Sequence, residues 1–409
     1  MSYLYNDLVG FKGNAVDAFN RLKVSEPFTM FDSQQRYQVS DKWDYRGMTG
    51  GTYSYNLNES SVSLTSGTTI GSKIYAETKR IFAYQPGKSL LVVNTFALNS
   101  PKAGLRQRLG YFGITGGITA ATPYNGIYLQ QDGLTLSICL ASASLGTTTI
   151  VNQQDWNGDK FDGTGDSGRT LDVTKGNIFW SDIEWLGVGD VRSGFFVDGR
   201  PIIAHTFHND NVNPTTYMTT ASLPCRFEIE NTAGQTGSST MKQICSSVMS
   251  EAGYEGFSRR YNVATGTTPY NMSSADTFYP IVSIRLNSNR LDSAIVPSNA
   301  SIICTTNTWI QYRIVLNGTF TGTTPTWNTH FNGNVDYVLH AETTGLTGAT
   351  DIIGGYLNQG GEATVSEAND FNFQLGRTQT GVSDILTIMC AASTANTKVV
   401  TDLSWFELF

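Results

Sequence analysis

The sequence predicts an all-β protein: an antiparallel β-sandwich of the jelly-roll or concanavalin-like kind, preceded by an extended N-terminal arm with room for one short helix. Three observations support this fold class. Only 15% of the 409 residues are charged, whereas 41 are glycine, and soluble domains usually carry about a quarter of charged residues. Apolar and polar residues alternate with a period of two, as in half-buried strands. Segments rich in Gly, Thr and Asn separate these runs, which is typical of sandwiches.

Residues 1–45 form the predicted arm. Asn14 is placed to cap a short helix. Pro27 and the glycine-rich segment 47–51 separate this part from the rest of the chain. We expect the arm to dock onto a neighbouring subunit, and the alternative is a core helix of the main domain. The candidate docking residues of the arm are Phe19, Arg21, Leu22, Val24, Pro27, Phe28 and Phe31.

From about residue 50 several segments alternate between apolar and polar side chains, which predicts strands with one buried face and one solvent-facing face. These segments are 182–185, 226–230, 310–316 and 335–339. The continuous apolar run at 90–93 instead predicts a fully buried strand. Two pairs, Asp198-Gly199 and Asn317-Gly318, predict hairpin turns.

The predicted organisation is an arm at 1–45, a β-sandwich domain at 46–258, and a further part at 259–409. The third part is either a second β-rich unit or a continuation of the same sandwich. A loop-rich zone near 255–280 marks the division. We find no internal repeat and no heptad pattern that would encode a fibrous shaft.

The net charge of −7 argues against a nucleic-acid partner, because binding to phosphates needs an excess of Lys and Arg. It argues in the same direction against an anionic membrane surface, and no apolar run is long enough to span a bilayer. The start of the sequence lacks a secretory signal pattern. The widely spaced cysteines have no metal-ligand spacing and are expected to be free thiols in a reducing cytoplasm: Cys139, Cys225, Cys245, Cys304 and Cys390.

One segment, AFNRLKVSEPFTMFDS at 18–33, resembles the N-terminal signature of a broad family of tailed-bacteriophage virion structural proteins. The resemblance extends over roughly the first 260 residues. It is carried by the segments 84–89, 101–112, 125–129, 159–165, 182–189 and 242–246. It implies a virion location after assembly in the host bacterial cytoplasm, with other virion structural proteins as partners, but it does not separate head from tail.

Two function classes follow. The first is a non-enzymatic structural component, a head-decoration or tail-attached protein that assembles as a homo-oligomer through its arm and sandwich surfaces. The second, kept as the alternative, is a glycan-binding or glycan-cleaving receptor-recognition protein of a tail or fibre. Exposed aromatic rings would stack on sugars, and the candidates in polar segments are Trp43, Trp156 and Trp327. We expect no cofactor, and no convincing catalytic pair of carboxylates can be named.

Three local patterns bear on chemistry and binding. The segment 155–166 places Asp155, Asn157, Asp159 and Asp166 at ligand positions of a calcium loop, but Lys160 replaces the required glycine. These are weak metal candidates, and an Asp/Gly-rich turn is the simpler interpretation.

A basic cluster of Lys102, Arg106 and Arg108 is a candidate docking patch for an acidic partner, with a solvated strand edge as the alternative. The segment 165–168 resembles a serine-protease motif but lacks the glycine that should follow it.

Overall fold

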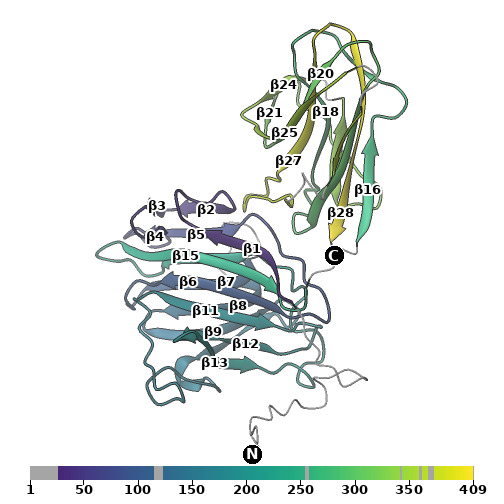
Figure 1. Cartoon of the computed structure of the whole chain (residues 1–409). Helices are drawn as coiled ribbons and strands as arrows, with labels where there is room; N and C mark the ends of the chain where they lie inside the picture. The colour runs from purple at the N-terminus through teal and green to yellow at the C-terminus, as the bar shows by residue number, and fades with distance from the viewer. Residues whose placement is uncertain are drawn as a thin grey trace, which may run out of the picture.

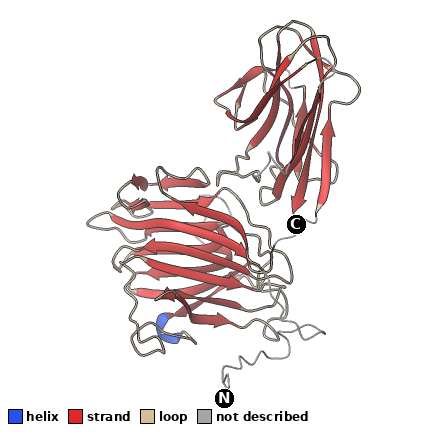
Figure 2. Ribbon diagram, viewed as in Figure 1, coloured by secondary structure: helices blue, strands red, loops and turns tan. Residues whose placement is uncertain are grey.

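The computed structural model describes residues 26–114, 123–253, 258–340, 343–358, 362–366 and 373–408. Over these residues the protein is built from antiparallel strands, with one short 3-10 turn at Gln153–Asp155 (Figure 2). The predicted all-β, sandwich-type fold class is therefore confirmed. The short helix expected near Asn14 lies outside the described residues.

The first sandwich is made of two sheets that stack face to face (Figure 1). One sheet has eight strands, with β1 beside β15. In order across the sheet its strands are β13 (Arg200–Phe207), β12 (Val191–Val197), β11 (Asn177–Ile183), β6 (Leu90–Ala97), β15 (Ser239–Ser250), β4 (Ser61–Ser66) and β3 (Thr52–Asn56), with β1 (Phe28–Gln34) added.

The other sheet of this sandwich has seven strands. They are β10 (Thr147–Asn152), β9 (Thr135–Ser142), β8 (Pro123–Asp132), β7 (Leu105–Ile114), β14 (Cys225–Asn231), β5 (Lys73–Thr78) and β2 (Trp43–Met48). The inward side chains of both sheets form one apolar core, which includes Phe96, Leu109, Phe179 and Phe227. Burial of these large side chains is the main stabilising contribution to such a sandwich.

The second unit begins at β16 and has its own core around Ile284, Ile302 and Trp405. Its five-stranded sheet contains β16 (Arg259–Ala264), β28 (Thr397–Leu408), β19 (Ala294–Cys304) and β26 (Glu362–Ser366), with β17 (Tyr270–Met272) beside β28. Its six-stranded sheet contains β22 (Asn328–Thr329), β23 (Val335–Leu339), β18 (Tyr279–Leu286), β27 (Ile385–Ala392), β20 (Ile310–Leu316) and β25 (Thr350–Leu357). A separate pair is formed by β21 (Thr319–Gly322) and β24 (Thr343–Thr347).

The last third of the predicted arm belongs to the first sandwich. β1 pairs with β15, from Phe28 opposite Ser250 to Gln34 opposite Cys245. Phe31 is only 3% exposed, and its ring lies 6.0 Å from that of Trp43. The arm boundary at residue 45 is therefore too late, because Phe31 and Trp43 of this stretch are buried within the same chain.

The candidate docking residues of the arm are distributed accordingly. Phe19, Arg21, Leu22 and Val24 lie outside the described residues. Pro27 is exposed and Phe28 is 47% exposed, so both remain on the surface. Phe31, by contrast, is excluded as a docking residue by its burial.

The predicted turns have different outcomes. Asp198 and Gly199 both have positive φ, +50° and +77°, and they join the paired strands β12 and β13, which confirms this hairpin. Asn317 also has positive φ, +59°, but the strand that follows, β21, pairs with β24 and not with β20. The Asn317-Gly318 turn therefore carries the chain from one sheet to another.

Two of the strand predictions also need correction. The run at 90–93 begins β6, in which buried and half-buried residues alternate, so the strand is not buried on both faces. In segment 182–185 only Asp182 and Ile183 belong to a strand, and Trp185 follows the end of β11. Segments 310–316 and 335–339 coincide with β20 and β23.

Phe31→Ala is expected to lower the free energy of unfolding by about 3–5 kcal/mol, because it leaves a cavity beside Trp43 and Phe82. Tyr37→Ala is the matched control from the same segment, since Tyr37 is 73% exposed. Chemical denaturation of both variants measures the difference. Equal stabilities would contradict the assignment of β1 to the core.

Candidate functional site

The polar side chains of β14 are buried, although their alternation predicts a solvent-facing side. Phe227 and Ile229 point into the core, as expected. On the opposite side Arg226 and Glu228 are 0% and 1% exposed. Two charges buried this completely must have charged partners on the neighbouring strands.

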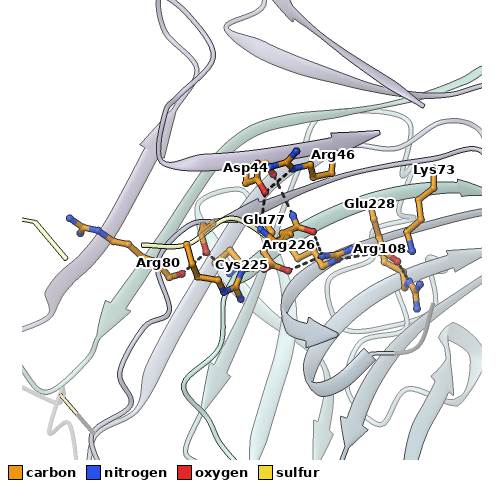
Figure 3. Close-up of polar contacts among 12 residues, drawn as sticks. Asp44, Arg46, Lys73, Glu77, Arg80, Arg108, Cys225, Arg226 and Glu228 are labelled. Carbon is orange, nitrogen blue, oxygen red and sulfur yellow. Dashed lines mark hydrogen bonds and ion pairs between the residues drawn. The ribbon is translucent and has the colours of Figure 1, made fainter. Parts of the chain in front are cut away.

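Those partners form a charge ladder, made of Lys73, Glu77, Arg108, Arg226 and Glu228 (Figure 3). Arg226 Nε lies 2.9 Å from Glu228 Oε2, and Arg226 Nη1 lies 2.7 Å from Glu77 Oε2. Arg108 Nε donates to the other Glu228 oxygen. Lys73 Nζ lies 3.6 Å from Glu228 Oε2. β5, β14 and β7 are thus joined by side chains as well as by their backbones.

Glu228 is the centre of the ladder. Burial alone would raise the pKa of Glu228, but the charges of Arg108, Lys73 and Arg226 outweigh this effect and hold the pKa well below its usual range. Glu228 therefore stays ionised inside the protein. The ladder fixes the register of three strands, because a slip by one residue would leave a charge buried without a partner.

The predicted basic docking patch is divided by this arrangement. Arg108 is 2% exposed and belongs to the ladder, so it is not available to a partner. Arg106 Nη2 pairs with Glu230 Oε2 at 2.7 Å, and its side chain is only 21% exposed. Lys102, in the loop before β7, is half-buried. The patch prediction fails for Arg108 because a charge on an alternating strand looks solvent-facing in sequence whether or not its face is covered.

The calcium-loop candidates form turns. Asp159 accepts backbone N–H groups of Phe161 at 2.8 Å and Ser167 at 2.7 Å. Asn157 exchanges two hydrogen bonds with the backbone of Thr206. Asp155 and Asp166 are exposed. These contacts agree with the Asp/Gly-rich turn, and no group of three or more His, Cys, Asp or Glu with metal-binding geometry occurs in the described parts of the chain.

The ladder continues into the second unit through residues 373–384, which we call the docking loop. Leu375 of this loop is 1% exposed in the second core, and its N–H donates to Ile295 O at 2.9 Å. Two residues further on, the Arg377 N–H donates to Lys79 O of the first sandwich, also at 2.9 Å. The loop is thus anchored in one unit and bonded to the other.

Side chains reinforce this contact. Arg377 Nη1 lies 2.6 Å from Glu77 Oε1, the oxygen of Glu77 that does not contact Arg226. The backbone N–H of Gln379 donates to Asp44 Oδ2 at 2.9 Å, and the side-chain oxygen Oε1 of Gln379 accepts from Arg226 Nη1 at 3.2 Å. In Figure 1 the chain segment before β27 accordingly lies beside β2 and β5.

Gly376 makes the approach of the two units possible. A Cβ atom there would lie 2.9 Å from Lys79 Cβ and 3.0 Å from Asp384 Oδ2. Neither neighbour is free to move, because Asp384 is held by hydrogen bonds from Gly376 N and Asn317 Nδ2. A residue without a side chain is therefore required where the docking loop passes Lys79.

A cleft of about 450 Å³ lies beside the docking loop. Lys79 contributes from the first sandwich, and Asn317, Phe320, Trp327 and Asp384 contribute from the second unit. Aromatic rings and hydrogen-bonding groups thus face one space at the boundary of two units. Small-molecule sites are commonly found at such places and have volumes of this order.

Trp327 is held in place before any ligand arrives. The Arg285 guanidinium lies 4.2 Å from the centre of its ring, and Phe320 meets it edge-on with 6.2 Å between the ring centres. Arg285 is in turn paired with Asp336 at 3.3 Å. A ring fixed in this way loses little conformational freedom when a ligand packs on it.

The three tryptophans singled out in the sequence therefore differ. Trp43 and Trp156 are 3% and 2% exposed and belong to the first core. Trp327 alone of these lines the cleft. Sequence reasoning missed Lys79, Asn317 and Asp384, because nothing in the sequence shows that residues so far apart meet. The Asn317-Gly318 pair predicts a turn at this position, but it does not indicate that the turn lines a cleft.

No protein-family model matches the chain. No curated protein matches it either. Among solved structures, the endo-β-1,4-glucuronan lyase of the fungus Trichoderma reesei is 13% identical with a TM-score of 0.37, over 54% of this chain and 95% of that chain. The carbohydrate recognition domain of Emp47p is 13% identical with a TM-score of 0.35, over 59% and 99%. A protein described with endo-acting O-glycanases of the human gut microbiota is 13% identical with a TM-score of 0.36, over 55% and 99%.

At these identities and TM-scores the likeness assigns no activity to this chain. The prediction that the chain is not an enzyme is contradicted and is withdrawn, since two of these structures carry enzyme names. The prediction was based on the lack of a recognisable carboxylate pair. Such a carboxylate pair cannot be recognised in the sequence of a sandwich, because neighbouring strands bring distant residues together.

No helix in the described ranges is both long and apolar enough to cross a membrane.

Glu228→Gln is expected to lower the free energy of unfolding at pH 7 by about 3–5 kcal/mol, because buried cations lose their shared carboxylate. The folded pKa of Glu228 is depressed, so its contribution is present above the unfolded value near pH 4 and is lost as the pH falls further. The wild-type protein should therefore lose more stability than the variant between about pH 5 and pH 2. Urea unfolding across this range measures both.

Asp32→Asn is the control for this variant. The Asp32 side chain is 71% exposed and pairs with Lys42 on the surface, so its loss should cost less than about 1 kcal/mol. If Glu228→Gln is no less stable than Asp32→Asn, the charge ladder does not contribute the stability that we assign to it.

Proposed function

We propose that the protein is a saccharide-binding protein carried on a tailed-phage particle, and that the cleft beside the docking loop is its binding site. The observation that carries the proposal is the combination of Trp327 and Phe320 with Asn317 and Lys79 around one cavity of about 450 Å³. A sugar ring presents an apolar C–H face and a rim of hydroxyl groups. It therefore needs an aromatic surface together with hydrogen-bond donors and acceptors.

The virion location is supported by the sequence resemblance of the segment 18–33 and the segments that follow it. In this proposal the protein is made in the host cytoplasm and becomes part of the particle, where its partners are other virion proteins. Residues 1–25 are the candidate attachment segment, since the chain from Phe28 onward is built into the first sandwich.

A structural role in the particle is a second candidate, and one observation favours it. β10 is the outer strand of the seven-stranded sheet. Ile150 on this strand is 54% exposed, and Leu134 and Leu145, in the turns at the two ends of the neighbouring β9, are 75% and 36% exposed. Strand edges with exposed apolar residues are suited to contacts between subunits. Both roles are compatible in one protein that assembles as a homo-oligomer.

Binding to a glycan array tests the saccharide proposal. Trp327→Ala is expected to weaken binding about tenfold or more, because the ring supplies the apolar contact. Trp309→Ala is the matched control: Trp309 is 48% exposed, lies against Tyr356 at 5.8 Å, and does not line the cleft. Absence of binding by the wild-type protein would overturn the proposal. Binding that depends on Trp309 and not on Trp327 would place the site elsewhere.

Particle incorporation tests the attachment segment. A chain that begins at residue 26 keeps β1 and Trp43, so it should unfold at the same temperature as the full chain but be missing from purified particles. A chain that begins at residue 46 loses both and should not fold. Mass spectrometry of purified particles measures incorporation. Normal incorporation of the chain that begins at residue 26 would show that residues 1–25 are not needed for attachment.

A further inference from the structure

Lys79 carries a positive charge that forms no ion pair with any described residue of the chain. Its backbone is fixed by two hydrogen bonds, from its N–H to Lys42 O at 3.0 Å and from the Arg377 N–H to its carbonyl oxygen at 2.9 Å. Its half-buried side chain lines the cleft. Across the described part of the chain its ammonium group has no ion pair, whereas Lys73, six residues earlier on β5, is paired twice.

Asp384 is the one acid among the described residues that line the cleft. Both of its carboxylate oxygens accept hydrogen bonds from other residues of the protein. Its Oδ2 accepts from Gly376 N at 2.8 Å, and its Oδ1 accepts from Asn317 Nδ2 at 2.7 Å. Arg80 also lies close enough to feel its charge: burial lowers the pKa of Arg80, and Asp384 and Asp32 oppose that change. Both carboxylate oxygens of Asp384 thus accept hydrogen bonds within the protein, and Asp384 forms no ion pair with Lys79. The Lys79 ammonium group therefore remains available to an anionic ligand.

We infer that the cleft takes an acidic saccharide, a sugar that carries a carboxylate such as a uronic or sialic acid. The carboxylate pairs with the Lys79 ammonium group while the C–H face of the ring packs on Trp327. Lys79 of the first sandwich and Trp327 of the second unit line the same cleft, so both units contribute to recognition. This inference rests on the proposed saccharide-binding function and adds the chemical class of the ligand.

The test uses the full-length protein and a panel of neutral, uronic-acid and sialic-acid oligosaccharides. The tightest acidic ligand is then measured by calorimetry beside its methyl ester, which keeps the shape and removes the charge. We expect the ester to bind about tenfold more weakly than the acid, since a charge-assisted hydrogen bond is lost. Lys79→Gln should weaken binding of the acid by a similar factor and leave binding of the ester unchanged.

Lys79→Arg is the matched variant, since it keeps the positive charge and should retain binding of the acid to within about threefold. Thermal unfolding of both variants checks that the docking loop contact is intact. Binding of neutral sugars alone, or equal binding of acid and ester, would overturn the acidic-ligand inference and leave the saccharide proposal standing. Binding of no sugar at all would overturn both.

Discussion

The buried pairing of Arg226 with Glu228 and Glu77 joins neighbouring strands of the first sandwich, and through Glu77 it also reaches the second unit. The Arg226 guanidinium contacts Glu228 on its own strand, β14, at 2.9 Å and Glu77 on β5 at 2.7 Å. Arg108 on β7 donates a hydrogen bond to Glu228. A face of a sheet that is covered in this way cannot tolerate a slipped register, because any slip leaves a charge buried and unpaired. The ladder thus adds specificity to a sandwich whose stability comes from its apolar core.

The same ladder determines where the second unit sits. Glu77 uses one oxygen for Arg226 and the other for Arg377 of the docking loop, so a single side chain belongs to both the sheet and the contact between units. Leu375 anchors the other end of the loop in the second core. The cleft follows from this contact, because it is lined both by Lys79 of the first sandwich and by residues of the second unit, among them Asp384.

The candidate site was only partly predictable. An exposed or half-buried tryptophan in a polar segment is a reasonable sugar-binding candidate, and Trp327 fits that description, yet Trp43 and Trp156 fit it equally well in sequence and are buried in the core. The error over Arg108 has the same origin. Sequence alternation shows that a side chain points away from the core of its own sheet, but not whether something else covers it.

The all-β class, the strands at 310–316 and 335–339 and the Asp198-Gly199 hairpin could be predicted from the sequence, because they depend on period-two patterning and on local φ preferences. Tertiary contacts alone establish that residues 28–34 form a strand of the sandwich, that the polar face of β14 is buried, and that Lys79 and Trp327 line one cleft. Those facts depend on contacts between residues far apart in the chain, and local pattern holds no information about them.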